Sequence, residues 1–549
     1  MLLSVSVTLS QTVNPEILWA TYFGSPGNDF TGCVATDNDE NIYMSSTVKS
    51  GAPTTEGVHQ RAYGGGLSDV MLTKFDKNGN LIWSTYFGGS GNDANYFPMS
   101  LMSDGAIVIT GNTTSTNKIA TTDAHHSSFG GGSSDAFIAV FENNGTLRWA
   151  TYFGGSGTDS DPAVTIDQSD NIYLVGYTGS LSEIATDSAF QSTKKESEDA
   201  FLAKFDKTGK LIWSTYYGGQ GYDAFYGVTT DQDYNVYVGG ESNSSQLATT
   251  GSFKSNYGGN GDGFLAKFDK DGKRIWATYF GSGGTDGIYY LASDQKNNIY
   301  CIGPTTSTEG IASTGAYATM HSGKEDVFIA KFNAKGDRLW STYIGGDEWD
   351  SVFGCDFDDD DNVYLAIMTK SQNFPLTADV PMPYFGGGPW DAAFVKFSSA
   401  GELKWSTYFG GDGNDRAISL ALDKSQNIVA SINADSKGLA TPGAYDEIAN
   451  GNESLLIKFR DATIVDIKEI ALMAELQIFP NPTSTYFEIP NNRDEIRNIS
   501  IYNASGEMVR SHIYTKKENF DISDLVAGLY YVVINTKGIS AATKLIKIH

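Results

Sequence analysis

The sequence WSTYFGG at residues 83–89 is present seven times, with small changes, in this chain of 549 residues. Successive copies begin 63 to 66 residues apart, at Trp19, Trp83, Trp149, Trp213, Trp276, Trp340 and Trp405. A self-similar period of this length indicates a repeat architecture in which each unit is one supersecondary element. The repeat therefore decides the fold class.

Fixed polar positions follow each tryptophan. An aspartate lies ten residues after every copy, at Asp29, Asp93, Asp159, Asp223, Asp286, Asp350 and Asp415. In six copies a second aspartate follows eight residues later and an asparagine four residues after that, as at Asp37 and Asn41. The second copy has Leu101 and Gly105 at these places. Asp-x-x-x-Asn between two apolar runs is typical of a hairpin turn, because both side chains can bond nearby backbone.

A second hairpin completes each unit. Its first strand starts at a third acid and ends in a Lys-Phe pair in six copies, and the tryptophan motif is its second strand. The third acids are Asp69, Asp135, Asp199, Asp262, Asp326, Asp391 and Glu453. This acid lies 26 to 30 positions after the asparagine position, a variation that predicts a surface loop. Because the tryptophan recurs once in each fourth strand, we interpret it as a packing element.

The two ends of the repeat region complement each other. The region begins with a lone fourth strand at 17–24 and stops after a third strand that ends at Phe459. Four-stranded antiparallel units bury both faces when they stack radially, and pairing the two ends removes two open edges. The sequence therefore predicts an all-β chain in which residues 12–460 form a seven-bladed β-propeller of four-stranded blades, closed by the N-terminal strand.

The repeated pattern resembles a known family. W-S-T-Y-F-G-G-x-G-x-D, D-x-x-x-N-I-Y, A-T-T-G-x-F and G-G-x-x-D-A-F-x-A-K-F follow one another over roughly residues 17–460. This series is similar to the SBBP (seven-bladed β-propeller) repeats of bacterial exported proteins. The resemblance implies a propeller fold and brings no shared catalytic residues with it.

A separate module at 476–549 follows a mixed linker at 461–475. FPNP at 479–482, IYN at 501–503, GEMV at 506–509, LVAGLY at 525–530 and KLIK at 544–547 occur in this order. The strand and turn pattern predicts a small C-terminal β-sandwich. The motifs resemble the type A sorting domain of the type IX secretion system of Bacteroidota. That resemblance implies that residues 476–549 engage the type IX secretion machinery and that the protein is secreted or held at the outer cell surface.

Composition excludes some partners. The formal net charge of −27 argues against a nucleic-acid partner, because phosphate neutralisation needs a basic surface. Residues 1–11 carry a short apolar run without a positive start, which we interpret as a truncated signal peptide. No other segment is long and apolar enough to predict a transmembrane span. Cys33, Cys301 and Cys355 are expected to be buried free thiols and not a disulfide framework.

The acids that begin the first and third strands are expected on one face of the ring, because the loops before these strands share that face. Their presence in every blade favours a structural role, in which each carboxylate bonds local backbone N–H groups. The alternative is a site for a cation or a cationic ligand at the channel mouth.

The sixth blade breaks the symmetry. Trp349 and Trp390 are the tryptophans outside the fourth strands, and the long loop of the same blade contains Tyr384 and Phe385. Large rings supply binding area at low entropic cost. These four residues therefore predict an exposed patch for a glycan or a surface-protein ligand, with local loop packing as the alternative.

Metal and catalytic signals are weak. Asp358, Asp359, Asp360 and Asp361 lie in one first-hairpin turn, where a solvated turn is expected and weak calcium binding is the alternative. We find no His-x-x-x-His and no Gly-x-Ser-x-Gly, and we assign no catalytic residue and no cofactor. We therefore expect a non-catalytic binding, adhesion or scaffold module. An extracellular carbohydrate-active hydrolase or lyase with a site at the channel is the alternative.

Overall fold

The computed structural model of the chain describes residues 15–95, 98–461, 478, 481, 483–488, 498–503, 508–513, 520–535 and 540–548. The chain divides into two compact units, residues 1–461 and 462–549. The predicted signal segment at 1–11 and the linker from 462 to 475 lie outside the described residues. All the regular structure that is described is β-strand, which confirms the all-β prediction. The described residues contain no helix that is long and apolar enough to cross a membrane.

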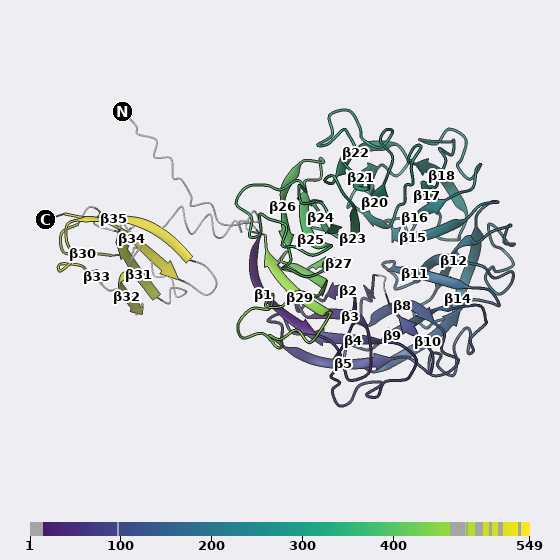
Figure 1. The fold of residues 1–549 in the computed structure, drawn as a ribbon, viewed down its shortest axis with the longest axis horizontal. Coiled ribbons are helices and arrows are strands. Elements are labelled where there is room, and N and C mark those ends of the chain that lie inside the picture. The colour runs from purple at the N-terminus through teal and green to yellow at the C-terminus, as the bar shows by residue number, and fades with distance from the viewer. Residues whose placement is uncertain are drawn as a thin grey trace. The chain divides into compact units, whose positions relative to one another are not determined.

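Seven antiparallel sheets follow one another around a ring in the first unit (Figure 1). We call them blades 1 to 7. Blade 1 is β2 (Phe30–Thr36), β3 (Ile42–Val48), β4 (Asp69–Phe75) and β5 (Leu81–Phe87). Blade 2 is β6 (Asp93–Ala94), β7 (Ser100–Leu101), β8 (Ile107–Thr113), β9 (Asp135–Phe141) and β10 (Leu147–Phe153). Blade 3 is β11 (Asp159–Ile166), β12 (Ile172–Thr178), β13 (Asp199–Phe205) and β14 (Leu211–Tyr217).

The other four blades have the same order. Blade 4 is β15 (Asp223–Thr230), β16 (Val236–Ser242), β17 (Asp262–Phe268) and β18 (Arg274–Phe280). Blade 5 is β19 (Tyr290–Ser293), β20 (Ile299–Thr305), β21 (Asp326–Phe332) and β22 (Arg338–Ile344). Blade 6 is β23 (Asp350–Phe357), β24 (Val363–Thr369), β25 (Asp391–Phe397) and β26 (Leu403–Phe409). Blade 7 is β27 (Asp415–Leu422), β28 (Ile428–Ala434), β29 (Glu453–Arg460) and β1 (Glu16–Phe23).

The ring is closed by strand exchange, as predicted. β1 pairs antiparallel with β29, so the first strand of the chain is the fourth strand of the last blade. The register runs from Glu16 opposite Arg460 to Phe23 opposite Ser454. Tyr22 and Phe23 are buried in this position. The N-terminal strand therefore supplies core side chains as well as backbone hydrogen bonds to blade 7.

Blade 2 departs from the pattern. Its first strand is interrupted, and the two pieces β6 and β7 both pair with β8. Met102 N–H donates to the Ala106 carbonyl at 2.8 Å, as Asp37 N–H does to Asn41 at 3.0 Å in blade 1. The turn positions are thus Met102 and Ala106. The assignment to Leu101 and Gly105 was wrong by one residue, because the interrupted strand contains one residue more.

The repeated tryptophan joins six of the seven blades to the next by an indole hydrogen bond. Trp213 of blade 3 donates its Nε1–H to the Lys270 carbonyl in the blade 4 turn at 3.1 Å. Gly272 of that turn has a φ of +82°, and a Cβ there would lie 3.0 Å from the indole ring. The turn can contact the ring this closely because glycine has no side chain. This contact confirms that the motif is a packing element.

The C-terminal unit contains two sheets. One has the order β32 (Met508–Ile513), β31 (Asn498–Asn503), β34 (Gly528–Asn535) and β35 (Ser540–Lys547), and the other pairs β30 (Tyr486–Phe487) with β33 (Phe520–Asp521). Phe487 and Phe520 of the small sheet share one apolar cluster with Ile499, Val532 and Leu545 of the large sheet. Apolar side chains from both sheets meet in one core, which confirms the predicted small sandwich.

The three cysteines are free thiols. Cys33 and Cys301 are buried, and Cys355 is half-buried. Burial raises the pKa of the Cys33 thiol to about 12, so this group stays protonated. The prediction of free thiols is confirmed, and these residues pack as small apolar side chains.

Candidate functional site

The two sets of strand-start acids lie on one face and meet in pairs at the blade seams. Gly88 lies between Asp69 of blade 1 and Asp93 of blade 2, where a Cβ would be 2.6 Å from one carboxylate and 2.8 Å from the other. Asp93 accepts hydrogen bonds from Gly89 N–H at 2.8 Å and Ser115 Oγ at 2.7 Å. Both carboxylates are fully buried. These local bonds are those of a structural device that fixes the loops at each seam.

Several of the paired acids have raised pKa values. Burial raises the pKa of Asp69 to about 7. The hydrogen bond from Gly64 N–H lowers this pKa, and the neighbouring Asp93 carboxylate raises it further. Burial likewise raises the pKa values of Asp135 and Asp391 to about 7. The pairs that contain these three aspartates can therefore hold a proton near neutral pH.

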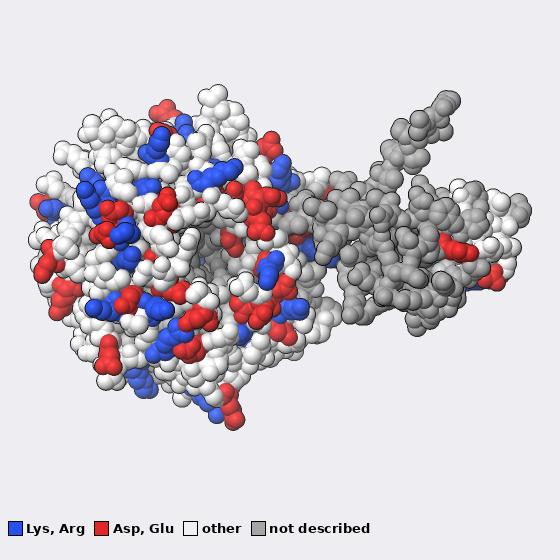
Figure 2. Space-filling model, turned by 180° about the vertical axis from the view of Figure 1, so that it is seen from behind, with Lys and Arg blue, Asp and Glu red and all other residues white. Residues whose placement is uncertain are grey.

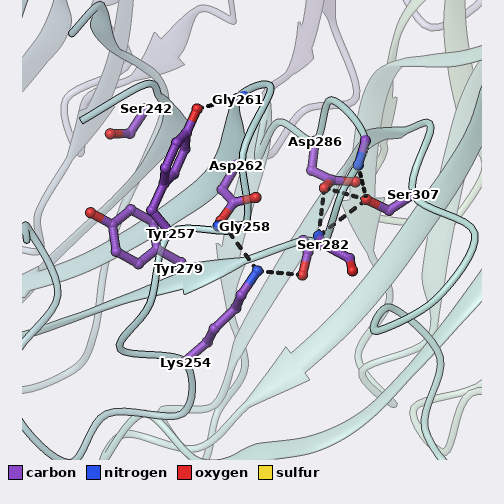
Figure 3. A network of polar contacts seen from close by, with 12 residues as sticks. Ser242, Lys254, Tyr257, Gly258, Gly261, Asp262, Tyr279, Ser282, Asp286 and Ser307 are labelled. Atoms are coloured by element: carbon purple, nitrogen blue, oxygen red, sulfur yellow. Dashed lines mark hydrogen bonds and ion pairs between the residues drawn. The ribbon is translucent and has the colours of Figure 1, made fainter. Parts of the chain in front are cut away.

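One seam has a cation beside its acid pair. Lys254 lies 3.2 Å from the carboxylate of Asp262 and donates to the Gly281 carbonyl at 2.7 Å. Figure 3 shows Lys254 and Asp262 facing each other, with Asp286 beside Ser307, whose Oγ donates to Asp286 at 2.7 Å. The corresponding loop position in the other blades is Gln60, His126, Gln191, Ala318, Met382 or Asp446. The lysine is therefore a local solution for one seam and not a feature of the ring.

The predicted calcium residues lie on a turn that the blade itself uses. Asp358 accepts hydrogen bonds from Asn362 Nδ2 at 2.8 Å and Tyr364 Oη at 3.1 Å, and Lys396 Nζ lies 3.3 Å away. Asp359 and Asp360 are exposed, and Asp361 has a φ of +60°. No group of three His, Cys, Asp or Glu in the described ranges could hold a metal ion. Asp358 thus belongs to a structural network, and calcium binding at this turn stays a prediction.

The predicted aromatic residues of blade 6 have different environments. Trp349 is 40% exposed and Tyr384 is 81% exposed, whereas Trp390 and Phe385 are half-buried. Phe385 meets the Tyr408 ring edge-on, with 5.8 Å between the ring centroids. No ring contact among the described residues joins Tyr384 to either tryptophan. Phe385 thus packs within its loop, and a shared aromatic surface of the other three residues stays a prediction.

Two cations complete the site around the tryptophans. Lys370, directly after β24, places its Nζ 4.2 Å from the centroid of the Trp390 ring, and Arg416 of blade 7 places its Cζ 6.0 Å from it. Lys370 N–H donates to the Trp349 carbonyl at 2.9 Å. We call Trp349, Lys370, Trp390 and Arg416 the blade 6–7 patch. Sequence reasoning missed both cations, although Arg416 is the one basic residue among those that follow the first-strand aspartates.

A second asymmetric group involves blades 3 to 5. The rings of Tyr226 and Tyr289 meet at 4.9 Å, and the hydroxyls of Tyr222 and Tyr226 lie 3.0 Å apart. Burial raises the pKa values of the Asp161 and Glu241 carboxyl groups, and both groups interact electrostatically with Tyr222 and Tyr289. These carboxyl groups differ from the paired seam acids because other blades have no equivalent of them.

Charged side chains of both signs are interspersed over the face seen in Figure 2, around a central hollow. Such a surface has no large field of one sign. A site for a charged ligand must therefore be built locally, from a few residues.

Two families match the chain. Residues 148–181 and 212–247 match the SBBP β-propeller repeat, and residues 477–548 match the secretion system C-terminal sorting domain. The chain therefore contains SBBP β-propeller repeats and a type IX secretion sorting domain. Both sequence resemblances are confirmed. The sorting domain indicates a protein that the type IX system exports to the cell surface or the extracellular medium.

Two curated proteins align with part of this chain at low sequence identity. An uncharacterized WD repeat-containing protein of Acanthamoeba polyphaga mimivirus is 22% identical over 508 residues, covering 76% of this chain and 36% of the relative. The regulatory protein FlaEY of Caulobacter vibrioides is 23% identical over 338 residues, covering 58% of this chain and 34% of the relative. The chain thus spans about a third of the length of these two relatives.

Solved structures are similar at low identity. YCF48 with a bound peptide is 7% identical, with a TM-score of 0.38, over 82% of this chain and 99% of that chain. A gluconolactonase of Xanthomonas campestris is 12% identical, with a TM-score of 0.30, over 64% of this chain and 91% of that chain. At these TM-scores neither structure indicates a function for the SBBP propeller, so its function rests on its own residues.

Proposed function

We propose that the exported propeller is a non-catalytic binding module whose ligand contacts the blade 6–7 patch. The observation that carries the proposal is the break in sevenfold symmetry. The seam acids recur in every blade, whereas Trp390 and its two cations occur at one place, next to the second extra tryptophan, Trp349, whose carbonyl accepts the Lys370 N–H. Residues that leave the repeat pattern without serving blade packing are the best candidates for recognition.

The patch has the chemistry of a recognition surface. Trp349 keeps 40% of its surface exposed, and large exposed rings with neighbouring cations are enriched at binding sites. Three of the four patch residues lie on loops that rigid blades hold in place, and Arg416 is the second residue of β27, an arrangement that suits binding function. A glycan or a surface protein outside the cell is the expected class of ligand.

The proposal is tested by screening the purified chain and its W349A/W390A variant on glycan and surface-protein arrays. We expect the affinity of the variant for the ligands that the wild-type chain captures to fall by about tenfold or more. Removing a ring at a hot spot costs at least about 1.4 kcal/mol of binding free energy. A Y384A variant is the matched control, since Tyr384 is exposed but outside the patch. Circular dichroism and melting confirm folding. Equal capture by the wild-type chain and the double variant would contradict the proposal.

A carbohydrate-active enzyme is the second candidate, and the group of Asp161 and Glu241 favours it. Two blade-specific carboxyl groups beside tyrosines supply the number of carboxyl groups that glycoside cleavage uses, and a raised pKa suits the one that acts as the general acid. Release of reducing ends from a polysaccharide panel, abolished in the E241Q variant, would support this candidate over the binding module.

A further inference from the structure

Trp390 holds two positive charges near its ring. Lys370 Nζ and Arg416 Cζ lie 4.2 and 6.0 Å from the ring centroid, and they come from different blades. The Trp390 backbone is fixed at the seam, because its carbonyl accepts the Asp415 N–H at 2.9 Å. A cation over an indole ring is attracted by the ring quadrupole, which limits the freedom of a long side chain. Both charges are therefore positioned before any ligand arrives.

Neither charge has an ion-pair partner within the part of the chain that the structure describes. No carboxylate among the described residues forms an ion pair with Lys370 or Arg416, and Arg416 Nε has only Asn414 Oδ1 at 3.4 Å. In contrast, Lys324 on a neighbouring loop pairs with Glu348 at 2.6 Å. The lysines of the third strands each pair with a turn aspartate. In a chain of net charge −27, two positioned and uncompensated cations form an anion-binding element.

An apolar surface lies beside this element. The Trp349 carbonyl accepts the Lys370 N–H at 2.9 Å, and its half-exposed ring faces solvent. A sugar ring that carries a carboxylate or sulfate group offers an apolar C–H face and a fixed negative charge. The Trp349 indole can stack on the apolar face of the sugar, and the Arg416 guanidinium and the Lys370 ammonium can bind its negative charge.

We propose that the blade 6–7 patch binds an acidic saccharide, one that carries carboxylate or sulfate groups. This inference rests on the proposed binding function and names its ligand class. An acidic peptide fits less well, because extended peptides gain affinity by pairing with an exposed sheet edge. The patch instead presents side chains from four separate segments, the residues before β23 and β25, the residue after β24 and the start of β27, and not the backbone of one strand.

The test uses the full chain with three probes: an oligogalacturonate, its neutral methyl ester, and a chondroitin sulfate oligosaccharide. Isothermal titration at low and moderate salt gives the affinities. We expect an acidic probe to bind at least tenfold more tightly than the ester, and binding to weaken as salt rises. The K370Q/R416Q variant should lose about tenfold or more in affinity, since a charged hydrogen bond is worth about 1.5–3 kcal/mol. The matched control is K324Q, whose lysine is already paired, and it should stay within about twofold.

The outcomes separate this inference from the proposed function. Equal binding of the ester and the acidic sugars, or an unchanged affinity in K370Q/R416Q, overturns the acidic-saccharide assignment. If the W349A/W390A variant still binds other array ligands more weakly than the wild-type chain, the proposed binding function stands without the acidic-saccharide assignment. Failure of both acidic probes together with binding of a glutamate-rich peptide, lost in K370Q/R416Q, also overturns the assignment and makes the ligand a protein. A preference between the carboxylated and the sulfated probe identifies the source of the charge.

Discussion

The ammonium group of Lys331 lies 2.9 Å from the carboxylate of Asp294, and the two side chains are only 9% and 1% exposed. Lys331 Nζ also lies 4.5 Å from the Tyr300 ring centroid and donates to the Tyr300 hydroxyl at 2.8 Å. Asn298 completes the network with a 2.8 Å bond to Asp294. The same arrangement recurs in most blades, so it is a standard part of the repeat.

The K331M variant should therefore weaken blade 5. Removing one partner of a buried pair leaves the Asp294 charge uncompensated, which costs about 3–5 kcal/mol. Hydrogen exchange of β20 and β21 should become markedly faster, and the urea midpoint should fall. K335M, in the exposed turn of the same hairpin, is the control and should change neither quantity.

Blade 2 shows which residues could replace the charged network of blade 5 and restore the stability that K331M loses. The four network positions there are Met102, Ala106, Val108 and Val140, all of them apolar. The variant D294M/N298A/Y300V/K331V copies this set into blade 5. Because it removes both charges together, it should recover most of the stability that K331M loses. A fourfold variant less stable than K331M would show that the network itself, and not the isolated charge, is what the blade requires.

The seam between Trp213 and Gly272 gives a second prediction. In G272A the new Cβ would lie 3.0 Å from the indole, on a backbone with a φ of +82°. The left-handed backbone costs about 1–2 kcal/mol and the overpacking about 1–3 kcal/mol more. G251A is the matched control, since Gly251 has a φ of +80° with nothing within 4 Å. Equal losses in the two variants would mean that the indole contact contributes nothing to the joint between blades.

The seam acids predict a pH dependence. The folded pKa of Asp69, about 7, is above the ordinary value of 3.8, so the folded state binds the extra proton. The stability from this group is complete below pH 4 and is lost as pH rises through about 7. Asp135 and Asp391 act in the same direction. We therefore expect a higher melting temperature at pH 5 than at pH 8.

The D69N variant tests the cause of this dependence. A neutral amide has no charge to bury and cannot repel Asp93, so melting at pH 8 should rise relative to the wild type while melting at pH 5 changes little. Asp294 behaves oppositely, because despite its burial Lys331 and Asn298 hold its pKa below the ordinary value. Stability from that group is lost only as pH falls below about 4. A D69N variant whose melting shows the same slope from pH 5 to pH 8 would assign the dependence to other groups.

Most of the ring could be predicted from the repeat because each copy must supply the same strands and turns. The missing tryptophan after Phe459 even predicted which strand closes blade 7. The interrupted strand of blade 2 escaped prediction, since Met102 and Ala106 replace the aspartate and asparagine that mark this turn in the other blades, so the motif could not reveal the added residue. The contact of Lys370 with Trp390 also escaped, because it spans a loop whose path the period does not constrain.

The closing strand gives the last prediction. β1 supplies Tyr22 and Phe23 to the core and ties blade 7 to blade 1 through Trp19 Nε1–H, which donates to the Lys77 carbonyl at 3.2 Å. A chain that begins at residue 25 should lose about 3–6 kcal/mol from these two buried rings alone. It should also associate, because the β29 edge is left open. The control is a chain that begins at residue 15 and keeps β1. Light scattering and urea melts compare them, and two equally stable monomers would show that the ring closes without strand exchange.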